Sequence, residues 1–467
     1  MRRVVLREYD WLCSDEASSR RRQRTLERNP MGVIPAALFE RLRAFDLERA
    51  RAQMPAGKRA RDYTIFEWDE DDAKAREWVG VLQIDGLQVE VVPKVDRRAD
   101  ARLDDEAAAR HNLLTMLAYT PNSPIRERDL ASLIRDDVPL HELLFRLFAE
   151  RLERELIRGI ERGYVERHED LSTVRGRMDL RRQILALGGR GEKFACVHDV
   201  FDEDTPLNRI LLSTALAISR ITTVLATQKT LRHCTALLGR VQRVPLMPHL
   251  FTRVRLTRQT ERFEPLLAMS EMLLGEQSPG MASGEHHSFS LFFSMSAVYE
   301  GFVGGFYRRH VEPLLPDVVM REQGGSRKFD LLHSMRSNRG RLKLEPDFLF
   351  ECVDDDGELR NFVIDTKWKR IDWKDSGDSV KREDLYQLHA YMTAYGARHV
   401  ALLYPDVGVD DYHYELGKDR VAGIAPSKRR TIMVRSLDVS SSLQDPAHRE
   451  SLAARLAQLV RSGLELA

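Results

Sequence analysis

The chain has 467 residues, enough for two or three domains, and 43% of them are hydrophobic, so it can bury a sizeable core. Its 73 basic and 72 acidic residues nearly cancel, so overall charge indicates neither a nucleic-acid nor a membrane partner, although local charge still can. Its four scattered cysteines form no CxxC pair, and it shows no signal peptide or apolar run of about 20 residues. We therefore expect a cytoplasmic protein without zinc, disulfides or a membrane span.

Residues 1–103 are predicted to form a β-rich adaptor. The stretch "EWVGVLQIDGLQVEVVPKV" (77–95) has two apolar segments around Asp85-Gly86. Asp-Gly between such segments predicts a hairpin, because the turn needs positive φ at its centre. Upstream, the basic stretch at 14–29 is either a solvated loop or helix, or a phosphate-binding patch.

Residues 104–284 are predicted to be mainly helical. "HELLFRLFAERLERELIRGI" (141–160) has apolar residues every three or four positions, and "PLNRILLSTALAISRITTVL" (206–225) is apolar enough for a buried helix. Between them, "LSTVRGRMDL" (171–180) is predicted to be a strand or loop. The stretch "GEQSPGMASGEHH" (275–287) is predicted to be a linker. Its His286-His287 has no matching ligand spacing nearby.

Residues 285–467 are predicted to form an α/β domain with a mixed sheet. The expected elements are a helix in 289–310, strands in 346–353 and 359–368 joined by an Asp-Gly turn, a helix in 382–396, strands in 399–405 and 430–439, and a helix in 448–464.

The strand "LRNFVIDTKW" (359–368) carries Asp365 and Lys367, whose side chains point to one face because strand side chains alternate. Pairing with the preceding strand can bring Asp347 beside Asp365. Two such carboxylates repel each other unless a cation lies between them, and Mg²⁺, or Mn²⁺ in its place, suits a small oxygen site. Lys367 would then orient or help deprotonate a water, or stabilise charge on a phosphate, as phosphodiester hydrolysis needs. The alternative is a salt bridge on an edge strand.

Three other residues are weaker candidates. Glu300 is one helical turn from Ser296 and Gly304, small neighbours that would leave its carboxylate reachable as a metal ligand. Gln387 and Tyr391 are four apart on one helix face, where they could contact DNA phosphates. The alternatives are a solvated helix glutamate and ordinary helix packing.

Taken in order, Glu300, Pro346-Asp347 and Asp365-Thr366-Lys367 resemble the PD-(D/E)XK nuclease signature, in which acidic residues bind Mg²⁺ and the lysine assists the water. More narrowly, the chain resembles the McrC family, the nuclease subunits of McrBC-type 5-methylcytosine restriction systems. The likeness rests on stretches such as "FFSMSAVYEGFV", "LEPDFLF", "FVIDTKWK" and "DLYQLHAYMTAYG", and covers most of residues 77–405. It departs at Ser294-Met295-Ser296 and Tyr299-Glu300, where the family has Asp-Met-Asn and Phe-Glu.

The resemblance implies a Mg²⁺-dependent DNA endonuclease with Asp347, Asp365, Glu300 and Thr366 at the metal, Lys367 on the water, and Gln387 and Tyr391 in support. It implies double-stranded, methylated DNA as substrate and an AAA+ GTPase or ATPase partner that reads the modified base. This chain is not that motor, because it has no GxxxxGK[ST].

By the same resemblance, the N-terminal region would dock on the motor and stimulate its hydrolysis. Arg175 and Arg177 are candidates for contacts to the motor or DNA, or are ordinary surface arginines. Two rival functions are open at this point. One is a stand-alone repair nuclease that uses the same site. The other is an adaptor that binds DNA or activates an ATPase without cutting.

Overall fold

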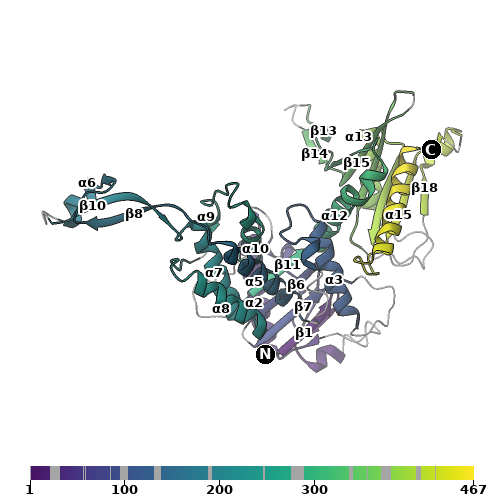
Figure 1. Cartoon of the computed structure of the whole chain (residues 1–467). Coiled ribbons are helices and arrows are strands. Elements are labelled where there is room, and N and C mark those ends of the chain that lie inside the picture. Colours follow the sequence, from purple (N-terminus) through teal and green to yellow (C-terminus); the bar gives the residue numbers. More distant parts are fainter. Residues whose placement is uncertain are drawn as a thin grey trace.

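The computed structural model describes residues 2–20, 32–55, 57, 59–84, 86–94, 104–130, 138–187, 192–245, 248–274, 289–335, 340–354, 356–369, 380–405, 412–425 and 428–466. They form two β-sheets near the N-terminus, a helical region from which a long β-ribbon projects, and a C-terminal α/β region (Figure 1). The ribbon and the C-terminal region lie at opposite ends of the molecule. The predicted linker at 275–287, with its two histidines, lies outside the described residues.

Two four-stranded sheets form the N-terminal part. The first has the order β1 (Arg2–Arg7), β7 (Leu87–Val92), β6 (Trp78–Ile84) and β11 (Phe289–Ser294). The second has the order β3 (Gly32–Val33), β2 (Trp11–Cys13), β5 (Asp72–Ala75) and β4 (Phe66–Trp68), and helix α2 (Ala36–Gln53) packs beside it. The predicted hairpin is confirmed, because β6 and β7 pair antiparallel up to Ile84 opposite Leu87, and Gly86 has a φ of +81°.

The start of the predicted helix at 289–310 is wrong. Its first six residues form β11, which pairs antiparallel with β6, and helix α12 (Met295–Phe306) follows, ending in a π-helical turn at Tyr307–Val311. Gly80 permits the pairing, since its φ is +149° and a Cβ there would lie 1.9 Å from the Leu291 carbonyl oxygen. Residues 289–294, expected in the C-terminal domain, thus complete the N-terminal sheet.

The middle region is mainly helical, as predicted. Its helices are α3 (Asp104–Tyr119), α4 (Glu127–Leu130), α5 (Leu140–Arg158), α7 (Pro206–Ile221), α8 (Leu225–Leu237), α9 (Pro248–Phe251) and α10 (Glu264–Leu274), and short 3₁₀ turns lie at Ala60–Asp62 and Glu261–Phe263. Helix α7 begins as its sequence predicts: Pro206 is its first residue, and the Thr205 hydroxyl accepts a bond from the Asn208 N–H. Within the described residues, no helix is both long and apolar enough to cross a bilayer.

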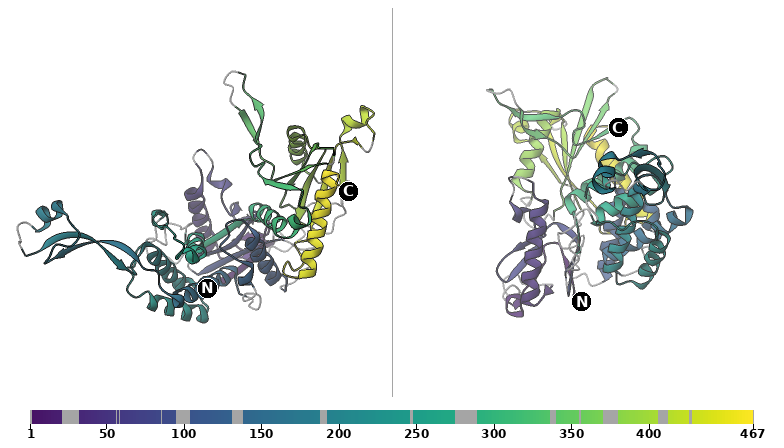
Figure 2. Two further views of the ribbon diagram at one scale, coloured as in Figure 1. Left: turned by 45° about the horizontal axis from the view of Figure 1, so that its top comes forward. Right: turned by 90° about the vertical axis from the view of Figure 1, so that its left-hand side faces the viewer.

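A projecting ribbon, which we call the arm, interrupts this helical region (Figures 1 and 2). It consists of β8 (Gly163–Leu171), β9 (Arg177–Met178), α6 (Leu180–Leu187) and β10 (Phe194–Asp202). Strands β8 and β10 pair antiparallel along nine residues each. The strand-or-loop expectation at 171–180 is confirmed, but the extent of the ribbon was not predicted. Strand β8 buries neither face, so its sequence lacks the apolar alternation that identifies a strand.

The C-terminal region has a mixed sheet, as predicted, and the sheet has six strands. Its order is β12 (Val319–Glu322), β15 (Phe348–Val353), β16 (Leu359–Thr366), β17 (His399–Pro405), β19 (Thr431–Leu437) and β18 (Tyr412–Glu415). Of these strands, β12 and β18 were not predicted. The central strands β16, β17 and β19 are parallel. The other elements are helices α13 (Arg382–Tyr395), α14 (Gly417–Val421) and α15 (Pro446–Leu464), a 3₁₀ turn at Glu312–Leu314, and a hairpin of β13 (Phe329–His333) and β14 (Gly340–Leu344).

Both faces of this sheet are covered. Val363 of β16 and Leu388 of α13 lie in one apolar cluster, whereas Phe362 and Ile364 lie in another with residues of α12 and α15. Because successive strand residues alternate between faces, the odd-numbered side chains of β16 point toward α13 and the even-numbered ones toward α12 and α15.

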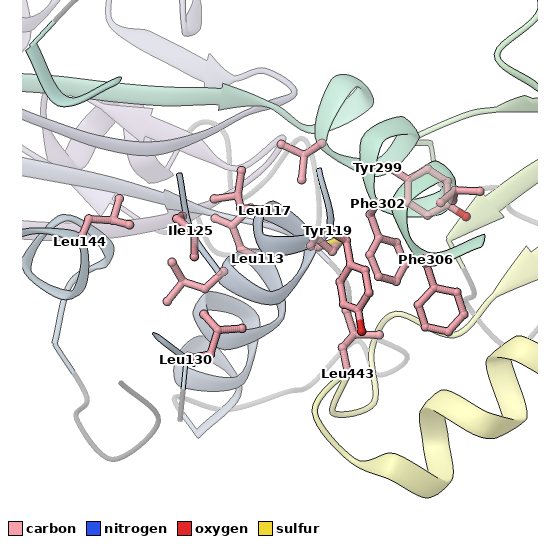
Figure 3. Packing of buried hydrophobic residues seen from close by; sticks show 14 of the residues in the cluster. Leu113, Leu117, Tyr119, Ile125, Leu130, Leu144, Tyr299, Phe302, Phe306 and Leu443 are labelled. Carbon is pink, nitrogen blue, oxygen red and sulfur yellow. The ribbon is translucent and has the colours of Figure 1, made fainter. Parts of the chain in front are cut away.

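A ring cluster joins the helical region to the C-terminal region (Figure 3). The ring of Tyr119, at the end of α3, lies 5.7 Å from that of Phe302 and 5.7 Å from that of Phe306, both on α12. Gly305 lets the two helices meet, since a Cβ there would lie 1.9 Å from the Tyr119 carbonyl oxygen. The position of α12, and of Glu300 on it, is thus fixed by the helical region.

Candidate functional site

The centre of the site is the end of β16, where the prediction placed Asp365 and Lys367 on one face. The two side chains form an ion pair, with the Lys367 Nζ 2.5 Å from Asp365 Oδ2. Only 2% of the Asp365 surface is exposed. The strand turns them toward α13, on the same side as Val363.

Asp347 lies just before β15, across from Asp365. The antiparallel ladder of β15 and β16 ends with Phe348 opposite Ile364, so the next step of the same register pairs Asp347 with Asp365. Asp347 Oδ2 accepts bonds from both the backbone N–H and the hydroxyl of Thr366, at 2.6 Å each. Thr366, predicted as a metal ligand, therefore uses its side chain to hold Asp347.

Gln387 and Tyr391 link Lys367 to the backbone before Asp347. Lys367 Nζ donates to Gln387 Oε1 at 3.2 Å, Gln387 Nε2 donates to the Tyr391 hydroxyl at 2.8 Å, and that hydroxyl donates to the Glu345 carbonyl oxygen at 3.1 Å. Tyr391 is only 3% exposed. Gln387 thus holds Lys367 directly and Tyr391 holds Gln387, while a contact of either side chain with a DNA phosphate stays a prediction.

Negative charge accumulates at this site. Burial, together with the neighbouring Asp347 carboxyl, raises the pKa of Asp365 to about 6 against the opposing effect of Lys367. Burial, followed by the charges of Asp347, Glu322 and Asp365, raises the pKa of Glu300 to about 7. Burial also raises the pKa of Asp347 despite the two bonds from Thr366. Glu300 on α12 therefore lies close enough to both aspartates for their charges to raise its pKa.

Lys367 remains a cation in this environment. Burial lowers its pKa, but the carboxylate of Asp365 outweighs that effect, so the net shift is upward. Lys367 is thus suited to attract a negatively charged group.

The donor set fits Mg²⁺, which binds one or two carboxylates and keeps several waters. Asp347 and Asp365 are two oxygen donors at adjacent strand ends, and their raised pKa values show that each lacks full compensation of its charge. Across the described part of the chain, no three His, Cys, Asp or Glu side chains are arranged to hold a metal ion together. Glu300 is coupled to the pair by charge, and its role as a third ligand stays a prediction.

Two residues at the site escaped the sequence analysis. Trp368 follows Lys367, and its indole N–H donates to the buried carboxylate of Glu8 in the N-terminal region. The available signal was the apolar Trp368 directly after Asp-Thr-Lys, but nothing in the sequence indicated a partner 360 residues away. Arg175 and Arg177, by contrast, lie on the arm and not at this site, and Arg177 pairs with Glu166 at 3.2 Å.

Comparison with known proteins identifies the family. The sequence model described as McrBC 5-methylcytosine restriction system component matches residues 73–405, most of the chain. The chain belongs to this family. No curated protein matches its sequence. The resemblance to McrBC-type systems that the sequence motifs indicated is thereby confirmed.

Two solved structures resemble this McrBC-family chain. One is the refined half-complex from a tetradecameric assembly of Thermococcus gammatolerans McrB AAA+ hexamers with bound McrC. It has 19% identity, covers 98% of this chain and 100% of that one, and has a TM-score of 0.65. The other, a McrBC complex from the same organism, has 22% identity, covers 66% of this chain and 88% of that one, and has a TM-score of 0.47. The first shows that the fold extends over the whole chain.

Proposed function

We propose that this McrBC component is a Mg²⁺-dependent endonuclease subunit that hydrolyses phosphodiester bonds in double-stranded, modified DNA. In this proposal the C-terminal region is a PD-(D/E)XK nuclease domain. The observation that carries it is the meeting of Asp347, Asp365 and Lys367 at the ends of two adjacent strands. Buried like charges facing a cation are typical of sites that bind metal and phosphate.

The side chains divide the chemistry between them. Asp347 and Asp365 would hold the metal, and Thr366 fixes Asp347 through two donated bonds. A bound Mg²⁺, or Mn²⁺ in its place, supplies a Lewis acid and lowers the pKa of a bound water. Lys367, oriented by Gln387, keeps its proton and would stabilise the negative charge that develops on the phosphate oxygens.

The partner in this proposal is an AAA+ GTPase or ATPase related to McrB, which would also recognise the modified base. McrC is bound to McrB hexamers in the Thermococcus complex. This chain shares its fold with a chain of that complex. The arm is the best-placed docking element, because it projects from the body at the end remote from the nuclease site (Figure 1). Arg175 and Arg177 would contribute polar contacts there, and the protein would act from the cytoplasm.

The arm also exposes apolar surface that its own fold does not cover. On α6, Leu180, Ile184 and Leu185 are 65%, 73% and 75% exposed. Exposed apolar side chains gathered on one short helix are typical of a protein interface. Together with the nearby arginines, they give a surface with an apolar centre and a polar rim.

Replacing Ile184 and Leu185 by serine is expected to weaken binding to the AAA+ partner by about tenfold or more, because each side chain contributes buried apolar area only in the complex. Titration of the partner with labelled full-length chain measures the dissociation constant. The control is Val421→Ser in the C-terminal region, where a valine that is 90% exposed should be replaceable without effect. Unchanged affinity in the α6 variant would place the docking surface elsewhere.

Cleavage is expected to increase as pH rises from about 5 to about 8. Asp365 has a pKa of about 6 and Glu300 of about 7, both raised first by burial, so these carboxyls lose their protons only in this range. A protonated carboxyl does not hold a metal, and so more Mg²⁺ should be needed at pH 6 than at pH 8. Initial rates across a matrix of pH and Mg²⁺ concentration test this, and a rate that falls with rising pH contradicts it.

The proposal as a whole is tested by mixing the purified chain with its AAA+ partner, Mg²⁺ and GTP or ATP on methylated and unmethylated DNA. Cutting that needs the partner and nucleotide supports it. Vigorous cutting by the chain alone indicates an independent nuclease, and no cutting with Mg²⁺ or Mn²⁺ under any condition indicates a non-cleaving adaptor.

A further inference from the structure

The end of β16 is tied to the N-terminal region by one buried contact. The indole Nε1 of Trp368 lies 3.0 Å from each carboxylate oxygen of Glu8, the residue after β1. The backbone N–H of Lys94, just after β7, donates to Glu8 Oε2 at 3.0 Å. Glu8 is fully buried and Trp368 is 4% exposed. The catalytic strand therefore ends on a carboxylate held by the N-terminal sheet.

Trp368 is the immediate neighbour of Lys367 on the opposite side of the strand. Lys367 points toward α13, where Gln387 accepts its bond, while Trp368 packs on the α12 side. The planar peptide keeps adjacent Cα atoms at a fixed distance, so holding Trp368 by its indole limits where the Lys367 Cα can lie. The Lys367 N–H donates to the Leu403 carbonyl oxygen at 3.0 Å, which sets the same segment from β17.

Helix α12 also contacts Trp368. The ring of Tyr299 lies 5.4 Å from that of Trp368, and Tyr299 directly precedes Glu300. At the start of the helix, the Met295 N–H donates to the Glu77 carbonyl oxygen, just before β6. Of the three elements that bring acidic residues to the site, β16 and α12 are therefore anchored at the same end of the first sheet.

The buried carboxylate of Glu8 contributes little to the stability of the fold. Burial raises the pKa of Glu8 to about 7, even though Lys94 and Trp368 donate to it. A buried carboxylate of this kind stabilises a fold less than a well-packed apolar side chain of similar size. Its hydrogen bonds do, however, fix direction in a way that apolar contacts do not, which is the property that a reacting group needs.

We propose that Glu8 is a positioning residue for the nuclease site, which it orients by holding Trp368 and hence the Lys367 end of β16. The inference rests on the proposed nuclease function. It makes the site dependent on the N-terminal region, so a shift of that region on a partner would reach Lys367 through a single side-chain contact.

The test uses Glu8→Ala, Trp368→Phe and the double variant in the full-length chain with its AAA+ partner. Each single change is expected to lower kcat about 10–100-fold, as is usual for residues that orient a reactive group, with little change in KM for DNA. The double variant should be no slower than the slower single variant, because both changes remove the same link.

Trp68→Phe is the matched control. Its indole Nε1 donates to the buried carboxylate of Asp46 at 2.9 Å, so the change removes the same kind of bond within the N-terminal region, away from β16. We expect kcat to be unchanged. An equal loss in this control would mean that general destabilisation explains all three variants, and would overturn the proposal.

Hydrogen exchange of the Lys367 amide gives a readout that does not depend on cleavage. Exchange should be faster in Glu8→Ala and Trp368→Phe than in the wild type, and unchanged in Trp68→Phe. If the wild type cuts DNA and Glu8→Ala cuts equally well, the inference fails while the nuclease function stands. If the wild type does not cut, the nuclease function fails, and unchanged exchange in Glu8→Ala then overturns the positioning link by itself.

Discussion

Replacing Asp365 by alanine is expected to reduce DNA cleavage by about a thousandfold or more, because the change removes a proposed metal ligand and the partner of Lys367 at once. Lys367→Ala should have a similar effect by removing the only cation placed between Asp365 and Gln387 among the described residues. Rates of plasmid cleavage with the AAA+ partner, Mg²⁺ and nucleotide measure both losses.

Neither change should damage the fold. The ionised Asp365 carboxyl is disfavoured by burial, as its raised pKa shows, so Asp365→Ala should leave the melting temperature unchanged or slightly higher. The matched control is Asp419→Ala, which removes another buried aspartate that is paired, at 2.6 Å, with an arginine of the same region. That variant should lose stability and keep its cleavage per folded molecule. Wild-type cleavage by both site variants would refute the assignment.

Replacing Glu90 by alanine is expected to lower the free energy of unfolding by about 3–5 kcal/mol, the usual effect of leaving a buried charge without its partner. Glu90 on β7 is 0% exposed and accepts from Arg110 Nε at 2.9 Å and from Nη2 at 3.0 Å. It also accepts from Arg3 Nη2 and from the Leu140 N–H, each at 3.0 Å. One carboxylate thus joins a strand of the first sheet to α3 and α5.

Urea denaturation measures this loss of stability. The pKa of Glu90 determines how its contribution to stability depends on pH. Burial raises the pKa of Glu90, but the bonds from Arg110 outweigh burial and hold it below 4.5. The contribution of Glu90 to stability is therefore present above about pH 4.5 and is lost as pH falls through the lower, folded-state pKa. A Glu90→Met/Arg110→Met double variant should recover part of the loss, because it removes both buried charges of this pair, and Arg3, which also loses Glu90, is 39% exposed. A loss below about 1 kcal/mol for Glu90→Ala would contradict the expectation.

The parts of the site that follow local rules could be predicted from sequence. Strand alternation put Asp365 and Lys367 on one face, and the turn with Asp356-Gly357 predicted the strand pairing that sets Asp347 opposite Asp365. The helix carrying Gln387 and Tyr391 was predicted, and Gly396 adopts the left-handed conformation at its end.

The remainder depends on partners distant in the chain. Phe289–Ser294 reads as the start of a helix because Leu291 falls on the same helical face as Met295 and Val298. Only the β6 strand, some 200 residues earlier, makes it a strand. The link from Trp368 to Glu8 likewise has no local signature, since a tryptophan at a strand end usually indicates packing alone. The arm escaped because its first strand, β8, lacks an apolar face.

The order of strands in the C-terminal sheet has a consequence for synthesis on the ribosome. Strand β16 lies beside β17, which in turn pairs with β19, and the last turns of α15 cover β16, with a Cβ at Gly463 only 2.3 Å from the Phe362 ring. These parallel pairings form only after β19 and α15 have emerged. A nascent chain would therefore have its arm and strands β1 to β7 before the sheet around Asp347 and Asp365 is complete.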